Sequence, residues 1–344
     1  MIKISKELKD SLKSVKKTWL ITGIGGFIGS SLLETLITHN QRVIGVDNFI
    51  TVKRANIESA INQAKEVEKK EFKFYEGCLT DIDTCRKVIK NVDIVLHQAA
   101  LGSVPRSIND PVMSNLHNNN GFLNMIHSCR ESDIENFIYA SSSSVYGDHE
   151  DLPKKENRIG NQMSPYAVSK YTNELYANAF ESSYGYKSIG LRYFNVFGKR
   201  QNPDSAYAAV ISRWLHSIIK NEQITIYGDG QTTRDFTHVD NAVEANLRAG
   251  LTVNNHAKGQ VYNIALNQRI SLNDLLELIK MYFSEKYDLN MKYEPKYEDF
   301  RKGDIRDSQA NIDKARKHLG YEPVTSVRDG IEKTIDWFID NHRK

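Results

Sequence analysis

Apolar runs of strand length alternate with helical patterns through residues 18–200 of this 344-residue chain. Helical spacing is found in SLLETLITHN, TDIDTCRKVIKN and NNGFLNMIHSCRESD. The strand-like runs between such segments are TWLITG, RVIGVDNF, FKFYEG, VDIVLHQAA, FIYASSS and SIGLRYFNVFG. Strands of a parallel sheet are covered by helices on both faces and therefore read as continuous apolar runs. The alternation predicts an α/β fold built on a doubly wound parallel sheet.

After residue 200 the alternation of strand-like and helical segments becomes less regular. QITIYGDG, VYNIA and MKYEP read as short strands, and SLNDLLELIKMYFSEKY and SVRDGIEKTIDWFIDNH read as helices. A chain of this length is long enough for two units. We therefore expect a smaller, mixed α/β substrate-binding unit, mainly residues 201–344, that interleaves with residues 18–200 and encloses a cleft with them.

Charge and cysteine content argue against several classes of function. The 46 basic and 43 acidic residues give a net charge of +3 without a basic, aromatic-interleaved run, so we expect no nucleic-acid partner. Cys78, Cys85 and Cys129 form no CxxC pair and no metal-ligand spacing, which indicates a reduced, cytoplasmic setting and no metal site. Residues 1–19 are charged throughout, so neither a signal peptide nor a membrane span is expected. Residues 1–17 are interpreted as an extension whose short helix packs beside the first strand.

A glycine-rich turn joins the first predicted strand to the first helix. Gly23, Gly26 and Gly29 have the spacing GxxGxxG, at which backbone can approach a pyrophosphate at a helix N-terminus. Asp47 ends the second strand, where its carboxylate would accept hydrogen bonds from ribose hydroxyls and repel a 2′-phosphate. The pattern predicts an NAD-binding Rossmann domain, mainly residues 18–200. The alternative is a flexible glycine turn with an Asp that caps a neighbouring group.

Residues flanking these elements are expected to extend the cofactor site. They are Phe27 and Ile28 in the first helix, Asn48, Phe49 and Thr51 after the second strand, and Gln98, Ala99 and Ala100 after the fourth. Small residues at strand ends can also serve packing alone, and that interpretation stays open for the last three.

Tyr166 and Lys170 lie four residues apart in SPYAVSKYTNELYANAF, so they share one helix face. Ser164 is predicted to be the N-cap and Pro165 the first helical residue, which places the phenol in the first turn. The helix dipole and a nearby ammonium favour the phenolate and lower the tyrosine pKa. The pair predicts a general base that takes a proton from an alcohol. The alternative is an amphipathic helix on which the two residues are incidental.

Four serines, Ser141 to Ser144, follow the strand FIYA directly. Open α/β sheets bind ligands at the carboxyl ends of their strands. A hydroxyl at this edge, for which we choose Ser142, could relay a proton between substrate and Tyr166. A polar loop without a function is the alternative.

Taken together, GxxGxxG, Asp47, the serine run, YxxxK and RYFNVFG resemble the extended short-chain dehydrogenase/reductase family over residues 18 to 340. Within that family, HQAALGSVPRS, ASSSSVYGD, LRYFNVFGKRQ and GDGQTTRDF are most similar to 4-epimerases of UDP-N-acetylhexosamines. The resemblance implies NAD held tightly and used without net redox change. It also implies a homodimer, through a four-helix bundle that includes the helix of Tyr166.

Catalytic roles follow from the same resemblance. Tyr166 would take the proton of the sugar 4-hydroxyl with help from Ser142, and the substrate would pass through a 4-keto intermediate. Lys170 would lower the Tyr166 pKa and hold the nicotinamide ribose. Tyr193 would pack against the nicotinamide, although an aromatic residue there also suits core packing.

The resemblance also implies the substrate contacts, for a UDP-sugar. Asn195, Arg234 and Arg301 would bind the diphosphate, Tyr227 would stack on uracil, Asp304 would meet the uridine ribose, Gly102, Ser103, Ser143 and Ser144 would face the hexose, and Ala209 and Val210 would line the nucleotide side. Arginine presents a planar fork of donors that suits a diphosphate. A surface charge or an ordinary ion pair is the alternative for each arginine.

Ser308 carries the expectation about specificity. In relatives restricted to UDP-galactose and UDP-glucose, the matching position is a tyrosine that fills the space beside the sugar 2-position. A serine leaves room for an N-acetyl group. An ordinary loop serine is the alternative.

The stretch after the third strand departs from the family pattern. Relatives usually have Gly-Asp-Ile-Arg there, with the aspartate accepting a hydrogen bond from the adenine amino group. This chain has Gly77, Cys78, Leu79, Thr80 and Asp81. A thiol is a poor acceptor, and Asp81 is expected to point elsewhere. Cys78 and Leu79 are still expected to line the cofactor site, with looser retention of NAD, because about 1 kcal/mol of hydrogen bonding is lost.

Other activities of this family need acidic residues where this chain has serines. Dehydratases have an Asp-Glu pair at the positions of Ser143 and Ser144, and similar decarboxylases keep a glutamate at the second. Neither acid is present, which favours the epimerase. Activity on UDP-glucose and UDP-galactose, or on a UDP-uronate, stays open. A non-catalytic, NAD-binding regulatory protein is the alternative from another class, although such proteins typically lose the tyrosine or the lysine.

Overall fold

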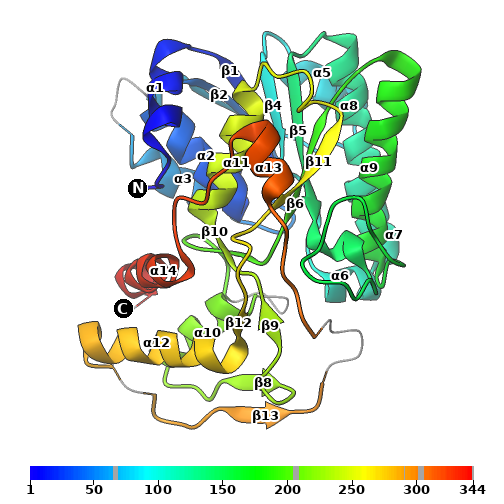
Figure 1. The fold of residues 1–344 in the computed structure, drawn as a ribbon. Coiled ribbons are helices and arrows are strands. Elements are labelled where there is room, and N and C mark those ends of the chain that lie inside the picture. The colour runs from blue at the N-terminus through cyan, green and yellow to red at the C-terminus, as the bar shows by residue number, and fades with distance from the viewer. Residues whose placement is uncertain (65–68, 204–208, 290, 301–305, 343–344) are drawn as a thin grey trace.

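The computed structural model describes residues 1–64, 69–203, 209–289, 291–300 and 306–342. Within them, seven parallel strands form one sheet in the spatial order β11-β6-β5-β4-β1-β2-β3 (Figure 1). The strands are β1 (Thr18–Thr22), β2 (Arg42–Asp47), β3 (Phe72–Glu76), β4 (Ile94–His97), β5 (Asn136–Ser142), β6 (Ile189–Tyr193) and β11 (Gln260–Ile264). The doubly wound parallel sheet predicted from the apolar runs is confirmed.

Helices cover both faces of this sheet because successive strand residues point to opposite sides. Trp19 and Ile21 of β1 pack into one buried cluster, and Leu20 between them packs into another. The first face carries α1 (Lys6–Ser14), α2 (Phe27–Thr38), α3 (Ala55–Ile61), α11 (Val239–Leu251) and α13 (Asp313–Leu319). The second face carries α5 (Ile82–Val88), α8 (Gly121–Glu131) and α9 (Pro165–Tyr184).

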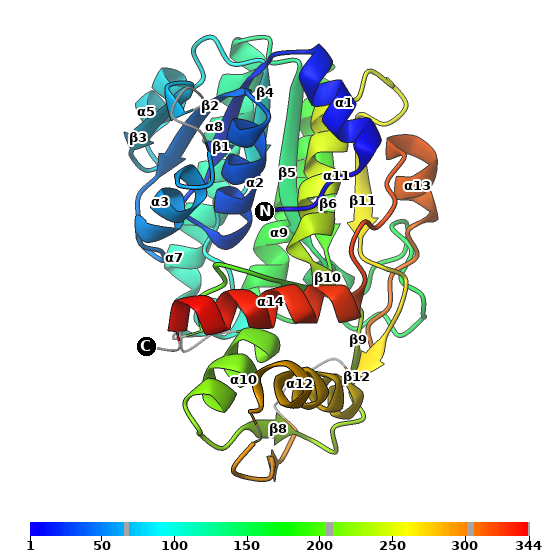
Figure 2. The same ribbon diagram turned by 90° about the vertical axis from the view of Figure 1, so that its left-hand side faces the viewer.

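A separate apolar cluster holds the smaller lobe together, which lies beyond the carboxyl ends of the strands (Figures 1 and 2). Its helices are α10 (Val210–Ile219), α12 (Leu272–Tyr287) and α14 (Val327–His342), and Figure 2 shows α14 between the sheet and the other two. Three pairs of short strands lie outside the main sheet: β7 (Val196–Phe197) with β10 (Thr237–His238), β8 (Thr225–Tyr227) with β13 (Lys296–Glu298), and β9 (Thr233–Arg234) with β12 (Ile270–Ser271). The β8–β13 pair lies at the end of the lobe farthest from the main sheet (Figure 1).

Short helical segments complete the carboxyl-terminal edge of the sheet. They are α6 (Val104–Asn109), α7 (Pro111–Asn115), the π-helix η1 (Leu116–Asn120) and the 3₁₀ helix η2 (Ser143–Tyr146). No helix in the described part of the chain combines the length and the apolar character that a membrane span requires.

Three predicted strands differ in detail. VYNIA was assigned to the smaller unit, but as β11 it pairs with β6 at the edge of the main sheet. MKYEP is not the strand; β13 begins at Lys296, because Pro295 has no N–H to give to a ladder. SIGLRYFNVFG divides into β6 and β7 at Asn195, whose φ of 39° turns the chain.

A buried ionic network ties α9 to the middle of the sheet. Both oxygens of Glu174 accept hydrogen bonds from Arg192 of β6, at 2.9 and 2.7 Å, and Ser141 of β5 donates to the same carboxylate. The two charged side chains are only 3–4% exposed. Because desolvated charges need each other, this network fixes the position of α9 against β5 and β6.

Replacing Glu174 with Ala should lower the free energy of unfolding by about 3–5 kcal/mol, because Arg192 is left as an unpaired buried charge. Urea titration measures this change. As a control, Glu277→Ala removes an exposed pair with Lys280 and should cost less than about 1 kcal/mol. Equal losses in the two variants would show that the network does not fix α9.

Candidate active site

The glycine turn after β1 is built for close approach by backbone. Gly23 has a φ of 66°, and a Cβ there would lie 2.7 Å from the Cα of Ala99. A Cβ on Gly29 would lie 2.2 Å from the carbonyl oxygen of Gly23. Among the described residues, no side chain caps α2 and no acidic residue lies in its first turn. The first N–H groups of α2 are therefore available to an anion, as the phosphates of a dinucleotide require.

Asp47 lies where β2 ends, on the sheet edge shared with this turn. Its carboxylate accepts hydrogen bonds from the backbone N–H groups of Gly25, at 2.8 Å, and Phe49, at 2.9 Å. These contacts orient the carboxylate beside the glycine turn. The placement suits recognition of a ribose diol.

Most of the predicted cofactor residues surround one pocket of about 100 Å³. The predicted members of its lining are Gly23, Gly26, Asp47, Asn48, Thr51, Cys78, Leu79, Gln98, Ala99 and Ala100. Val46, Val52, Gly77, Leu101 and His117 also line it and were not predicted. Phe27, Ile28 and Phe49 instead pack against the adjacent apolar cluster. No sequence signal indicated His117, which comes from the π-helix η1.

Cys78 lies in this pocket with polar neighbours. Its sulfur accepts a hydrogen bond from Asn48 Nδ2 at 3.3 Å and lies 3.1 Å from Thr80 Oγ1 and 3.7 Å from His117 Nδ1. Asp81 accepts hydrogen bonds from the N–H groups of Asp83 and Thr84, as the N-cap of α5. Asp81 is therefore engaged elsewhere, as expected. Looser retention of NAD stays a prediction.

The tyrosine helix has the local structure that the sequence predicts. Pro165 begins α9, and the side chain of Ser164 accepts a hydrogen bond from the N–H of Ala167 at 3.1 Å. The N–H of Tyr166 donates to Ser107 Oγ at 3.0 Å. Lys170 Nζ donates to the carbonyl of Ala140 in β5 at 2.8 Å and lies 6.0 Å from the centre of the Tyr166 ring. The pair thus lies against the carboxyl end of β5.

The pKa of Tyr166 differs from the expectation. Tyr166 keeps some accessible surface, but the surrounding protein desolvates its phenol and raises the pKa, while a hydrogen bond with Ser142 acts to lower it. The net change is upward. Burial also lowers the pKa of Lys170 to about 8. Lys170 does not offset the desolvation of Tyr166 here, because its ammonium is held by Ala140 and not by the phenol.

Ser141 and Ser142 of the serine run contact different groups. Ser141 donates to Glu174, whereas Ser142 ends β5, near enough to Tyr166 to act on the pKa of its phenol. Ser142 Oγ accepts two hydrogen bonds from Ser144, one from its backbone N–H at 3.1 Å and one from its side-chain hydroxyl at 2.9 Å. With both acceptor contacts filled, the Ser142 proton can point toward Tyr166. Ser142 is therefore the serine that the geometry favours as a relay.

Tyr193 is buried in the core, and its hydroxyl reaches the cofactor pocket indirectly. It donates to Gln98 Oε1 at 3.0 Å and accepts from Asn246 Nδ2 at 2.8 Å. Gln98 lines the pocket, so Tyr193 holds a lining residue in place. A direct contact with the nicotinamide stays a prediction.

A second pocket, of about 220 Å³, is lined by residues of the smaller lobe and of β7. It is lined by five of the predicted substrate residues, Asn195, Ala209, Val210, Tyr227 and Arg234. The lining residues that were not predicted include Arg213, Trp214, Thr232 and Phe236. The guanidinium of Arg213 lies 5.9 Å from the centre of the Tyr227 ring. Arg213 could have been suspected as a cation in a helix that follows Val210, but its direction was not readable.

The remaining substrate residues are not gathered in that pocket. Ser143 and Ser144 begin η2, and Gly102 and Ser103 precede α6, where Ser103 accepts a hydrogen bond from the N–H of Arg106. The N–H of Ser308 donates to the carbonyl of Thr233 at 3.2 Å, in β9. Arg301 and Asp304 lie outside the described residues. Within those residues, no group of three or more His, Cys, Asp and Glu side chains could hold a metal ion.

Comparison with known proteins agrees with this arrangement. Residues 19–265 match the model of the NAD dependent epimerase/dehydratase family. A protein of Methanocaldococcus jannaschii named as a putative UDP-glucose 4-epimerase is 35% identical over 94% of this chain and 99% of its own length. The structure of a UDP-N-acetylglucosamine 4-epimerase from Methanobrevibacter ruminantium, in complex with UDP-N-acetylmuramic acid, is 34% identical with a TM-score of 0.85. That of a UDP-glucose 4-epimerase from Thermotoga maritima, with UDP-glucose, is 31% identical with a TM-score of 0.84. Both superpose on 94% of this chain and 99% of their own.

The glycine turn, the strand-end aspartate and the tyrosine helix define an α/β nucleotide-binding enzyme. The chain belongs to the NAD dependent epimerase/dehydratase family, within the extended short-chain dehydrogenases/reductases. The resemblance stated from the sequence motifs is confirmed, and so is NAD as the cofactor of the family.

One buried acid beside the second pocket makes stability depend on pH. Asp235 is fully buried, and its oxygens accept hydrogen bonds from the N–H groups of Leu266, at 3.0 Å, and Ala310, at 3.1 Å. Burial raises its pKa to about 7. The native state therefore binds this proton more tightly than the unfolded state between the ordinary pKa of 3.8 and about 7, so stability falls as pH rises through that range.

Asp235→Asn cannot ionise, so it should remove this dependence. From about pH 5 to about pH 8 the wild type should lose about 2–3 kcal/mol more unfolding free energy than the variant. Urea titration at the two pH values measures the difference, and Asp340→Asn, at an exposed position, should behave like the wild type. Parallel pH profiles for wild type and Asp235→Asn would contradict the raised pKa.

Proposed function

We propose that this protein is an NAD-dependent 4-epimerase of UDP-hexoses that interconverts UDP-GlcNAc and UDP-GalNAc. One observation carries the proposal: Tyr166 lies with Lys170 and Ser142 at the carboxyl end of β5, on the sheet edge that also holds the glycine turn. The names of the similar proteins support a UDP-sugar as substrate.

The cofactor residues fit NAD. Gly23, Gly26 and the start of α2 would bind its pyrophosphate, and Asp47 its adenosine ribose. When bound, NAD supplies an acceptor for the hydrogen on the sugar C4 and returns it to the other face. The protein must supply a proton acceptor for the 4-hydroxyl and hold the sugar in place.

Tyr166 is that proton acceptor. Its pKa is raised in the ligand-free protein, and a positive charge bound close by would lower it strongly, because a desolvated site strengthens charge–charge attraction. The hydrogen-bond chain from Ser144 through Ser142 to the Tyr166 oxygen stabilises a developing phenolate. When the 4-keto sugar is reduced, the same phenol gives the proton back.

The second pocket would hold the nucleotide of the substrate. Tyr227 offers an aromatic face for uracil, and Asn195 and Arg234 lie on the same lining for the diphosphate. Arg213 adds a cation beside Tyr227 that the sequence did not indicate. Arg301 and Asp304 keep the roles proposed for them from the resemblance, as a second diphosphate cation and a ribose contact.

Epimerisation is favoured over dehydration because Ser143 and Ser144 stand where a dehydratase needs acids. Residues 141–144, at the end of β5 and the start of η2, are all serines. None of these four carries a carboxyl group that could protonate a leaving hydroxyl. UDP-glucose and UDP-galactose are a second candidate pair, supported by the names of the Methanocaldococcus jannaschii and Thermotoga maritima relatives.

A second copy of the chain is proposed to cover α7 and α9. These neighbouring helices expose large apolar side chains, among them Val112, Val168, Leu175 and Tyr184. Several large apolar side chains exposed on neighbouring helices are typical of an interface. Two copies of α9 with two copies of a neighbouring helix would form the four-helix bundle expected from the resemblance.

Purified protein with UDP-GlcNAc should form UDP-GalNAc, with NAD added if the protein loses it during purification. Tyr166→Phe should lower kcat by roughly 10²–10⁴-fold, since the proton acceptor is gone. Nucleotide-sugar chromatography measures both. Tyr176→Phe, at an exposed position on the same helix, should retain activity. No conversion of any UDP-hexose by NAD-loaded wild type would refute the proposal.

The Ser308 gate is tested by its own pair of variants. Ser308→Tyr should lower activity on UDP-GlcNAc by more than about tenfold and spare UDP-glucose, because the larger ring excludes the N-acetyl group. Ser308→Ala leaves the space open and should keep both activities. Unchanged activity of Ser308→Tyr on both substrates would show that specificity is set elsewhere.

A further inference from the structure

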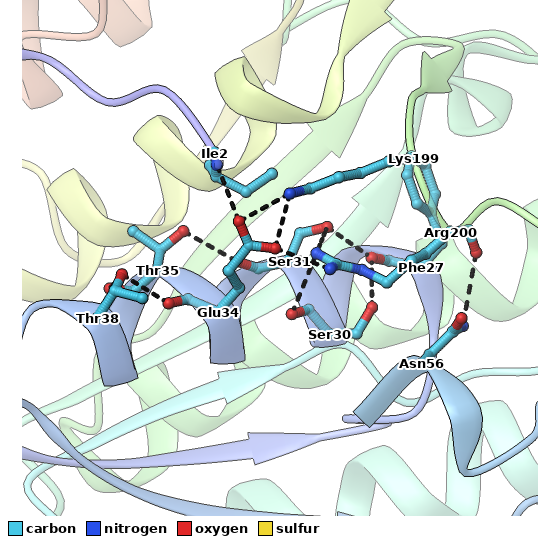
Figure 3. Close-up of polar contacts among 10 residues, drawn as sticks. All are labelled: Ile2, Phe27, Ser30, Ser31, Glu34, Thr35, Thr38, Asn56, Lys199 and Arg200. Carbon is cyan, nitrogen blue, oxygen red and sulfur yellow. Dashed lines mark hydrogen bonds and ion pairs between the residues drawn. The ribbon is translucent and has the colours of Figure 1, made fainter. Parts of the chain in front are cut away.

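A buried carboxylate in α2 has no task in the mechanism above. Glu34 is only 1% exposed. Its oxygens accept hydrogen bonds from Lys199 Nζ and Arg200 Nη1, both at 2.7 Å, and from the N–H of Ile2 at 3.0 Å (Figure 3). Burial acts to raise the Glu34 pKa, but the two cations lower it further, so the group is a buried anion. Three segments far apart in sequence meet at this one side chain.

The Arg200 side chain is built into α2. Its guanidinium also donates to Ser31 Oγ at 3.2 Å and to the Ser30 carbonyl at 3.5 Å, as Figure 3 shows. Arg200 has a φ of 67°, a conformation that costs free energy for a residue with a Cβ. The ion pair holds the chain in this conformation directly after β7.

The Arg200 backbone reaches the glycine turn by another route. Asn56 Nδ2 donates to the carbonyl of Gly25 at 2.9 Å and to that of Arg200 at 3.5 Å. Lys199 and Arg200 therefore contact α2 directly, and Arg200 reaches the turn before α2 through Asn56. On either side of them in the chain lie residues of the second pocket, Asn195 to Phe197 before and Ala209 and Val210 after. One connection thus links the two pockets.

The N-terminal extension closes the cluster from outside. Ile2, Ile4, Leu8 and Leu12 are buried in the main core. The N–H of Ser5 donates to Glu244 at 2.9 Å, and Arg248 of α11 pairs with Glu7 at 2.9 Å. The match to the family model begins at residue 19, so this extension precedes the matched region.

We propose that Glu34 is a positioning residue whose pair with Arg200 couples α2, the helix at the cofactor pocket, to the wall of the substrate pocket. Residues 1–14 form a strap over this pair. The strap completes the Glu34 contacts and keeps water out. Occupation of the glycine turn then orders the segment after β7, which prepares the second pocket. The role of that pocket rests on the proposed function, whereas the coupling itself does not.

Hydrogen exchange with NAD as the only ligand tests the coupling. In wild type, NAD should slow amide exchange in residues 196–202 by at least about fivefold, although most of them lie outside the cofactor pocket. Glu34→Gln and Arg200→Met should lose this slowing and keep the slowing around Gly23. Ile2→Pro removes the strap's N–H donor and should weaken the effect, whereas Ile2→Ala keeps the donor and should weaken it less.

Asn136→Ala is the control for general destabilisation. It removes buried hydrogen bonds to the Gly250 and Thr252 carbonyls at the amino end of β5, so it should lower stability and keep the coupling. The proposal is overturned if NAD leaves residues 196–202 unaffected in wild type, or if Glu34→Gln and Arg200→Met respond as wild type does. It is equally overturned if Asn136→Ala loses the effect. If the protein shows the coupling but converts no UDP-sugar, the proposed function is refuted and the coupling is not.

Discussion

The parallel pairing of β1 with β4 is the constraint on which the site depends. Its register places Thr22 beside His97, so the turn at Gly23 meets the backbone of Ala99 as the two strands end. The sheet order changes direction here, with β2 and β3 to one side of β1 and β4, β5 and β6 to the other. A crevice at such a point is where doubly wound sheets bind ligands. β5 then brings Ser142 to the same edge.

Desolvation sets the electrostatics of this edge. It raises the pKa of Tyr166 and lowers that of Lys170, because the charged form of each group loses water. The same loss of solvent makes Arg192 depend on Glu174 and Arg200 on Glu34. Charges of this kind hold helices α9 and α2 in place, while the raised pKa keeps the Tyr166 phenol neutral.

Local features were readable from the sequence, and contacts between distant segments were not. The glycine turn, Asp47 and the Ser164–Pro165 cap are determined by neighbouring residues, so their positions were predicted. His117 lies on a π-helix and lines the cofactor pocket, and Trp214 lies on α10 and lines the second pocket. Neither residue has a local sequence pattern that indicates where its side chain points. The four-residue spacing showed that Tyr166 and Lys170 share a helix face, but not that Lys170 donates to the Ala140 carbonyl or that burial raises the Tyr166 pKa. The strand predicted at MKYEP instead begins directly after that segment, at Lys296, because Pro295 cannot donate a backbone hydrogen bond.

The central claim is that the sugar C4 is oxidised and then reduced in one site, with Tyr166 handling only the hydroxyl proton. The most direct test is conversion of a UDP-hexose that carries deuterium at C4, in ordinary water, followed by mass and NMR analysis of the product. The account predicts that the epimer keeps the deuterium at C4. Loss of that deuterium to solvent would contradict the account, because it would mean that C4 is deprotonated and not oxidised.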